Sequence, residues 1–241
     1  MPLASLKTPF ATPHGVCSVY RPFAKPSQPA SRARTYSAAR MPGEAGTTIH
    51  FVTGNANKAR ELAEFFASNP VPFNITPTSL DLPEIQGDPE EIAMYKCSTA
   101  MEKLQAPVLV EDVCLGFNAL HGLPGPYIKQ FLQKLGHDGL NRMLKGFEDQ
   151  GAVAMCTVAY CAGPGGTPVV VVGKTEGKIV PARGPSSFGW DPIFEPAGSA
   201  LTYGEMTPAQ KSPFSHRHKA LKLLRDHLLA AAAAPEGQSS T

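Results

Sequence analysis

Three carboxylates in the sequence could bind a metal ion or accept a proton. Glu111 and Asp112 follow the apolar residues "PVLV" in "PVLVEDVC", at the expected end of a strand, and Glu84 lies in the loop "DLPEIQGD". Adjacent side chains on a strand point to opposite faces, so we expect only one of Glu111 and Asp112 to face a cleft. Carboxylates converging from separate loops, such as Glu84 and Asp112, suit a Mg²⁺ ion that keeps several waters and bridges phosphates. Surface carboxylates are common, and the spacing alone leaves open whether these two meet.

The segment "TGNANK" has the character of an anion-binding turn between a strand and a helix. Thr53, Gly54 and Asn55 stand where backbone N–H groups and the helix dipole can receive an anion. Lys58 falls in the first helical turn, where a cation costs up to about 1 kcal/mol. A negative ligand would compensate that charge, whereas the alternative is an ordinary loop with a solvated lysine. Neither a Walker A nor a dinucleotide glycine spacing is present.

The same charge anomaly recurs near the C-terminus. Ser215 is a good N-cap residue, and His216 and Arg217 occupy the first turn, which favours acids. A solvated basic helix is the simpler explanation for this site taken alone. Two helix starts with misplaced cations in one small domain favour a polyanionic ligand.

The segment "SSFGWDP" contains the single tryptophan of the chain, Trp190. Phe188 and Trp190 could stack on a planar base across the intervening Gly189, with Asp191 accepting from ring N–H groups. The alternative is an aromatic turn that caps the core.

A cysteine nucleophile is a further possibility to weigh. Cys114 and Cys156 lie within predicted strands, but no Cys/His/Asn signature accompanies them. His50, His121, His137 and His227 show no metal-ligand spacing, which indicates structural or solvated roles.

Predicted strands and helices alternate along the chain and would position these residues. The clearest helix start has Asp88 as N-cap, Pro89 at the first position and Glu91 completing a capping box, and Lys96 lies inside this helix. A hairpin around "GPGGT" predicts a mixed rather than a purely parallel sheet in an α/β domain. The expected strands are "TTIHFV", "FNITPTSL", "PVLVEDVC", "AVAMCTVAYCA" and "PVVVVGKTEGKIV", and the other expected helices are "NKARELAEFF", "IKQFLQKL", "GLNRMLKGF" and a final one from near Ser215.

The length of 241 residues and the 42% hydrophobic content predict one globular domain, at residues 46–232. Residues 1–45 have the composition of a transit or disordered leader, with no acidic residue before Glu44. We expect them to address a mitochondrion or a plastid, which the sequence does not separate; the alternative is a functionless tail with Met41 as a second start. Residues 233–241 are expected to be a disordered tail.

Charge, hydropathy and cysteine content argue against several classes of protein. The net charge is +2, and six basic residues precede Glu44, which leaves about −4 for the rest of the chain. A mildly acidic body argues against nucleic acid as a partner. No apolar run approaches the roughly 20 residues that span a membrane. Five cysteines without a C-x-x-C pair fit a reducing compartment.

Five motifs in order carry a resemblance to a known family. They are "FVTGNANK", "LPEIQGDPEEIAMYKC", "VLVEDVCLGFNALHGLPGPYIKQFL", "FGWDPIF" and "SHRHKAL". Together they closely resemble the inosine triphosphate pyrophosphatase family, over roughly residues 48 to 230. The turn "TGNANK" departs from relatives that often carry another basic residue before the lysine.

The resemblance implies an elongated, two-lobed α/β fold with a mixed sheet and a central nucleotide cleft, a homodimer, and a cytoplasmic location as the family default. It implies Mg²⁺, with Mn²⁺ as a substitute, and hydrolysis of ITP, dITP and XTP to the monophosphate and pyrophosphate, which keeps these nucleotides out of RNA and DNA. An alternative is a nucleotide-binding sensor that has lost catalysis.

The resemblance also assigns roles to individual residues. The phosphates would be held by Thr53, Gly54, Asn55, Ala56, Asn57 and Lys58. Further nucleotide contacts would come from Lys96, Lys129 and Lys211. The metal-associated carboxylates would be Glu84 and Asp112, with Asp112 also the general base. The base would be surrounded by Phe188, Gly189, Trp190, Asp191, His216 and Arg217.

Overall fold

The structure is a computed structural model that describes residues 46–185 and 188–233. The predicted leader, residues 1–45, lies outside the described residues, as does the predicted tail apart from Ala233. No helix in the described part of the chain is long and apolar enough to cross a membrane.

One mixed sheet of seven strands forms the centre of the domain, in the order β2-β1-β3-β5-β6-β7, with β4 paired to β3. β1 is parallel to β2 and β3, and the remaining pairs are antiparallel. The predicted mixed sheet is therefore confirmed. The strands are β1 (Thr48–Val52), β2 (Asn74–Thr78), β3 (Val108–Phe117), β4 (Pro124–Gly125), β5 (Gly151–Cys161), β6 (Val169–Ile179) and β7 (Phe194–Pro196).

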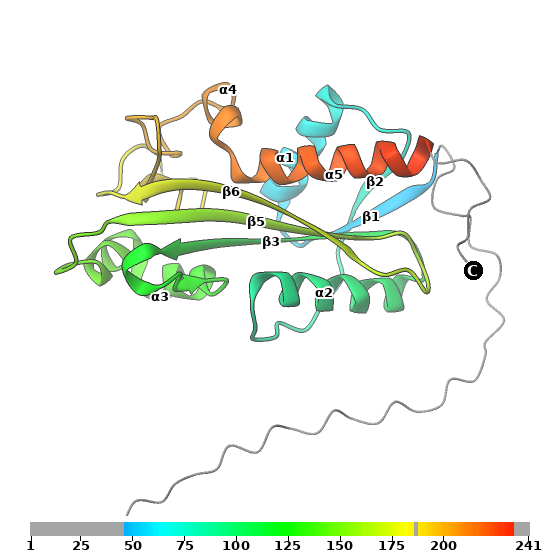
Figure 1. The fold of residues 1–241 in the computed structure, drawn as a ribbon, viewed down its shortest axis with the longest axis horizontal. Helices are drawn as coiled ribbons and strands as arrows, with labels where there is room; N and C mark the ends of the chain where they lie inside the picture. The colour runs from blue at the N-terminus through cyan, green and yellow to red at the C-terminus, as the bar shows by residue number, and fades with distance from the viewer. Residues whose placement is uncertain (1–45, 186–187, 234–241) are drawn as a thin grey trace, which may run out of the picture. The chain divides into compact units, whose positions relative to one another are not determined.

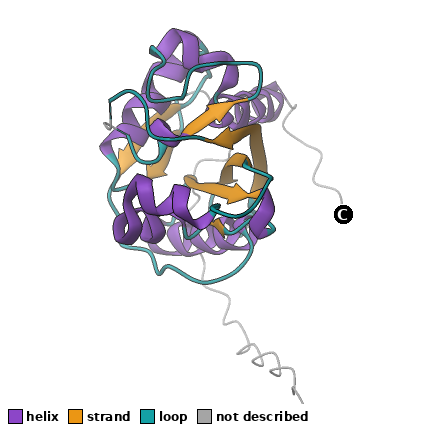
Figure 2. Ribbon diagram, turned by 90° about the vertical axis from the view of Figure 1, so that its left-hand side faces the viewer, coloured by secondary structure: helices purple, strands orange, loops and turns teal. Residues whose placement is uncertain are grey.

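Helices cover both faces of this sheet. α1 and α5 lie on one face and α2 on the other (Figure 1), and Figure 2 shows helices on both sides of the strands in a view turned by 90°. The helices are α1 (Ala56–Ser68), α2 (Pro89–Leu104), α3 (Ile128–Met143), α4 (Pro208–Lys211) and α5 (His216–Ala233), with 3-10 turns η1 (Asn118–Leu120), η2 (Asp191–Ile193) and η3 (Ser212–Phe214). The capping box predicted at Asp88 and Glu91 is present at the start of α2.

Three buried clusters hold the layers together. Leu62 and Phe65 of α1 and Leu221 of α5 pack with β1, β3 and β5. On the opposite face, Ala93 and Cys97 of α2 pack with β1, β3 and β5. The third cluster joins α3 to the far end of β3 and to the segment 190–203. Burial of this kind stabilises by about 25 cal/mol per Å² of apolar surface.

The segment predicted as two short helices is interrupted where expected. Gly136 has φ 64° and ψ −177°, so the helical residues on either side of it form two pieces of α3. Gly tolerates this left-handed φ because it has no Cβ.

β3 is longer than the sequence predicts, and this corrects the position of two carboxylates. Glu111 and Asp112 were expected at a strand end, but β3 continues to Phe117 because β5 supplies an antiparallel partner along its whole length. The parallel partner β1 stops earlier, where Val52 pairs with Val110. The two carboxylates therefore stand just beyond the end of β1, close to the start of α1.

Candidate active site

A cavity of about 710 Å³ opens between the helix starts and the loops beyond the end of β1. That volume lies within the range usual for small-molecule sites. It is lined by the start of α1, the loop 84–86, α2, β3, the start of α3, the loop 188–191 and the start of α5. The predicted site residues that line it are Asn55, Asn57, Lys58, Glu84, Lys96, Asp112, Lys129, Phe188, Gly189, Trp190, Asp191 and Arg217.

The other predicted residues are not part of this lining. Thr53 shapes the turn, because its Oγ1 accepts from the backbone N–H of Asn55 at 3.1 Å. Lys211 forms an ion pair with Asp191, and His216 is buried behind Trp190. The remaining two, Gly54 and Ala56, are exposed.

The start of α1 is capped by its own side chain. Asn55 Oδ1 accepts from the backbone N–H groups of Asn57 at 3.0 Å and Lys58 at 3.3 Å. These are two of the helix-start donors that were expected to meet an anion. Because Asn55 already bonds them, any ligand at this turn would depend more on the Lys58 side chain.

Asp112 and Glu111 face opposite sides of β3, as the strand alternation predicts. Asp112 lines the cavity, and its Oδ1 accepts from Lys96 Nζ at 2.7 Å. Its Oδ2 is buried and has no hydrogen-bond partner in the described part of the chain. A buried acceptor without a partner costs about 1–3 kcal/mol. This oxygen is therefore a position where a ligand, a water or a metal ion would be stabilised.

Glu84 enters the same cavity from the loop before α2. Its side chain is 61% exposed and lies 3.9 Å from Lys129 Nζ, and Gln130 Nε2 donates to it at 3.4 Å. Among the described residues no group of three or more His, Cys, Asp or Glu could hold a metal ion. Two carboxylates nevertheless fit Mg²⁺, which retains several waters and takes its other ligands from substrate phosphates.

The cations at the two helix starts share an internal partner. Glu111 accepts from Arg217 Nε and Nη2, each at 2.9 Å, and lies 3.3 Å from Lys58 Nζ. Arg217 Nη1 also pairs with Glu61. No local pattern predicts the pairs of Arg217, since its two partners lie 106 and 156 positions away along the chain. The misplaced helix-start charges are thus compensated in part inside the protein.

The segment 188–191 combines both interpretations that the sequence allowed. The Trp190 ring is 7% exposed and packs at 5.6 Å from Phe194 and 5.4 Å from His216, as a core-capping residue would. It also lines the cavity. The carbonyl of Gly189 accepts from His137 Nε2 at 2.8 Å, which ties this loop to α3.

Burial sets the charge states behind the loop. Burial, together with the neighbouring Arg217, lowers the pKa of His216 well below its ordinary value, so the imidazole is neutral. Its ring stacks on Tyr203 at 5.8 Å, and neither ring nitrogen has a hydrogen-bond partner among the described residues. Burial also raises the pKa of Asp191, against the opposing effect of Lys211.

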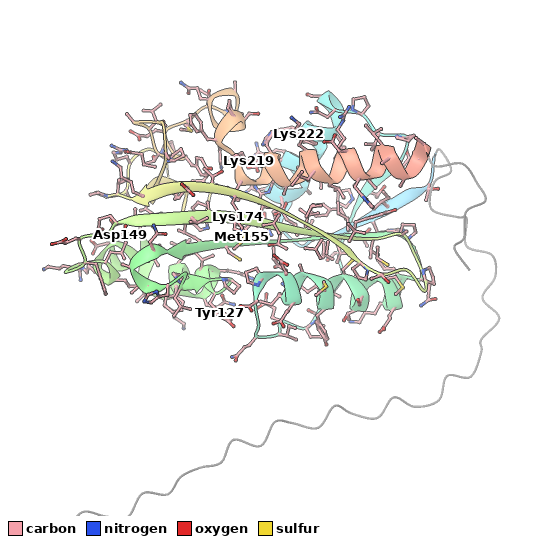
Figure 3. The ribbon with its side chains drawn as sticks, in the orientation of Figure 1. Tyr127, Asp149, Met155, Lys174, Lys219 and Lys222 are labelled. Atoms are coloured by element: carbon pink, nitrogen blue, oxygen red, sulfur yellow. The ribbon has the colours of Figure 1, made fainter. Side chains whose placement is uncertain are left out.

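Several lining residues were not assigned from the sequence, and Tyr127 and Gln130 are the two of them that make polar contacts at the site. Tyr127 lines the cavity between α2 and α3, where it is labelled in Figure 3, and its Oη accepts from the backbone N–H of Gly87 at 3.4 Å. Gln130 contacts Glu84. Both lie in "GPYIKQFL", so the motif was the signal that could have found them.

The four cysteines in the described part of the chain do not line this cavity. Cys114 and Cys156 are buried, and burial raises the pKa of Cys114 to about 12 and that of Cys156 well above its ordinary value. A protonated, inaccessible thiol is a poor nucleophile. We expect iodoacetamide at pH 7.5 to leave Cys97, Cys114, Cys156 and Cys161 unmodified in the native protein, as mapped by peptide mass spectrometry, with activity retained. Inactivation that tracks alkylation of Cys114 or Cys156 would restore the cysteine hypothesis.

Known proteins share both the sequence and the fold. The chain is 56% identical to the inosine triphosphate pyrophosphatase of Mycosarcoma maydis. The match covers 76% of this chain and 95% of that protein. It is 55% identical to the enzyme of the same name from Podospora anserina, again over 76% and 95%.

Solved structures of similar proteins share the fold of this chain. The Ham1 protein of Coxiella burnetii matches with a TM-score of 0.69 and 25% identity, covering 76% of this chain and 98% of that one. A dITP/XTP pyrophosphatase from Mycobacterium abscessus matches with a TM-score of 0.60 and 27% identity, over 73% and 98%. The family model described as the Ham1 family matches residues 49–227, which contain every cavity-lining residue named above. The chain belongs to the Ham1 family.

Proposed function

We propose that this chain hydrolyses ITP, dITP and XTP to the nucleoside monophosphate and pyrophosphate, and so keeps these nucleotides out of RNA and DNA. The observation that carries the proposal is Asp112, whose buried Oδ2 has no partner among residues 46–185 and 188–233 and which shares the cavity with Lys58, Lys96 and Lys129. A general base next to several cations suits the attack of water on a polyanion. A homodimer and a targeting role for residues 1–45 belong to the same proposal, on the strength of the family resemblance and the leader composition.

Phosphates would bind at the cationic end of the cavity. Lys58 projects from the start of α1 and Lys96 from α2, with side chains only 18% and 17% exposed. Lys129 is 69% exposed at the opening. Partly buried ammonium groups interact more strongly with phosphate than fully solvated ones, because water screens them less.

Asp112 and Glu84 would hold Mg²⁺, or Mn²⁺ in its place. When bound, the ion would neutralise charge on the phosphates and on the departing pyrophosphate. The protein's own contribution is to hold the Asp112 carboxylate in place through Lys96. Asp112 Oδ2 would accept the proton of a water whose oxygen attacks the α-phosphorus. The bond from that phosphorus to the bridging oxygen breaks, and pyrophosphate leaves.

The base would lie against Phe188 and Trp190, with Arg217 as a donor. A guanidinium has five N–H donors, of which the contacts to Glu111 and Glu61 use three, so within the described part of the chain two remain. Hypoxanthine and xanthine carry an acceptor oxygen at purine position 6, whereas adenine carries a donor amino group there. An adenine would place two donors against each other, at about 1–3 kcal/mol for each unpaired group.

A panel of triphosphates tests this function. With purified protein and Mg²⁺, we expect kcat/KM for pyrophosphate release to be about 30-fold to 10⁴-fold higher with ITP, dITP and XTP than with ATP, from two unpaired groups at about 1–3 kcal/mol each. Omitting the metal should abolish release. Equal rates with ATP would refute the proposed specificity. Tight ITP binding without any pyrophosphate release would favour the inactive sensor.

A further inference from the structure

Glu111 lies behind the cavity rather than in its lining. Its side chain is 1% exposed, whereas the neighbouring Asp112 lies on the cavity face of β3. Lys58 and Arg217, which Glu111 contacts, do line the cavity. Any influence of Glu111 on a bound nucleotide therefore acts through these two side chains.

One carboxylate fixes both cations at defined atoms. Arg217 holds it through two parallel N–H donors at 2.9 Å, a bidentate geometry that sets the plane of the guanidinium. Lys58 Nζ lies 3.3 Å from Glu111 Oε1 and donates to the Glu111 backbone carbonyl at 3.0 Å. The ammonium is thus held to both the side chain and the main chain of the same residue.

The charges require this partner. Lys58 and Arg217 stand at the starts of α1 and α5, where the helix dipoles already disfavour cations. Glu111 contacts both of these cations, and its single carboxylate keeps two like charges together behind one cavity.

We propose that Glu111 is a positioning residue that sets Lys58, toward the phosphates, and Arg217, toward the base, through one shared carboxylate. The inference rests on the proposed function for the roles of those two cations. It means that base discrimination and phosphate affinity are coupled at a residue that touches neither end of the nucleotide. Neutralising Glu111 should therefore damage both properties together.

The test compares Glu111→Gln with the wild-type protein in two measurements. The ratio of kcat/KM for ITP to that for ATP reports on Arg217, and the inhibition constant of inorganic tripolyphosphate reports on Lys58. The amide keeps the shape but offers one acceptor oxygen, and its NH₂ group would face cationic donors. We expect the ITP-to-ATP ratio to fall at least 10-fold and the tripolyphosphate inhibition constant to rise at least 5-fold.

Glu195→Gln is the matched control. The Glu195 side chain is also largely buried, at 10% exposed against 1% for Glu111, and it pairs with an arginine and a lysine, Arg183 and Lys178, away from the cavity. It should change neither measurement. If Glu111→Gln does not yield folded protein, Glu111→Asp retains the charge one methylene shorter and should shift both values in the same directions by a smaller factor.

The outcomes separate the inference from the function it rests on. Wild-type protein that fails to prefer ITP refutes the proposed function. Wild-type preference for ITP, with either the ratio or the tripolyphosphate constant unchanged in the folded Glu111 variant, overturns the positioning role alone. A residue that only stabilises the fold would lower the yield or Tm and leave both values, measured per active site, as they are.

Discussion

The Asp112→Asn variant is expected to lose about 10²–10⁴-fold in kcat with ITP, the usual contribution of a general base. An amide keeps the size of the side chain but does not accept a proton from water, and it also removes a negative charge beside the phosphates. The Asp112 side chain is 20% exposed and its ion pair with Lys96 is partly solvated. Because water still reaches the pair, losing its charge should leave the fold intact. Pyrophosphate release under saturating ITP and Mg²⁺ measures the loss, and circular dichroism checks the fold.

The same chemical change elsewhere provides the control for this variant. Asp226 lies on α5 outside the cavity and its side chain is 57% exposed, so Asp226→Asn should retain wild-type turnover. Loss of turnover in both variants would indicate a general effect of charge. Wild-type turnover in Asp112→Asn would show that another group accepts the proton.

Local signals predicted most of the elements. The capping box at Asp88 and Glu91 needs only neighbouring residues, and it starts α2 as expected. Gly136, which divides the two pieces of α3, is likewise a local signal, because a glycine adopts a φ of 64° without the steric cost that a Cβ would add. The length of β3 depends instead on pairing with β5, a partner distant in sequence, and it was underestimated.

In the candidate site, too, local features were predicted from the sequence and long-range contacts were not. The alternation of Glu111 and Asp112 along β3 correctly placed one of them in the cavity and one behind it. What the sequence lacked was the partner of each charge, because ion pairs between β3 and α5 arise only from tertiary packing. The helix-start cations at Lys58 and Arg217 suggested a missing anion, and part of that anion is the protein's own Glu111.

The closeness of α5 to β6 is a second feature that only packing creates. Gly173 sits in the valine-rich strand β6 at the point where the first turn of α5 crosses it. Lys219 Nζ donates to the carbonyl of Lys174 and to Thr175 Oγ1, both at 2.9 Å, and Figure 3 labels the two lysines at this crossing. A glycine inside a strand often marks such an approach of another backbone. The approach matters because the same turn carries Arg217 to the cavity.

Gly173→Ala should therefore destabilise the protein by about 3 kcal/mol, the upper end of the usual cost of overpacking. A Cβ at this position would overlap the carbonyl oxygen of His216 and lie 2.5 Å from the backbone nitrogen of Ala220, so the helix would have to move. For a domain of this size the loss corresponds to a Tm lower by about 6–12 °C. Thermal unfolding followed by circular dichroism measures it. Gly54→Ala is the matched control for stability, since nothing lies within 4 Å of a Cβ built there. An unchanged Tm in Gly173→Ala would mean that α5 shifts on β6 at little cost and that Arg217 is held by its carboxylates alone.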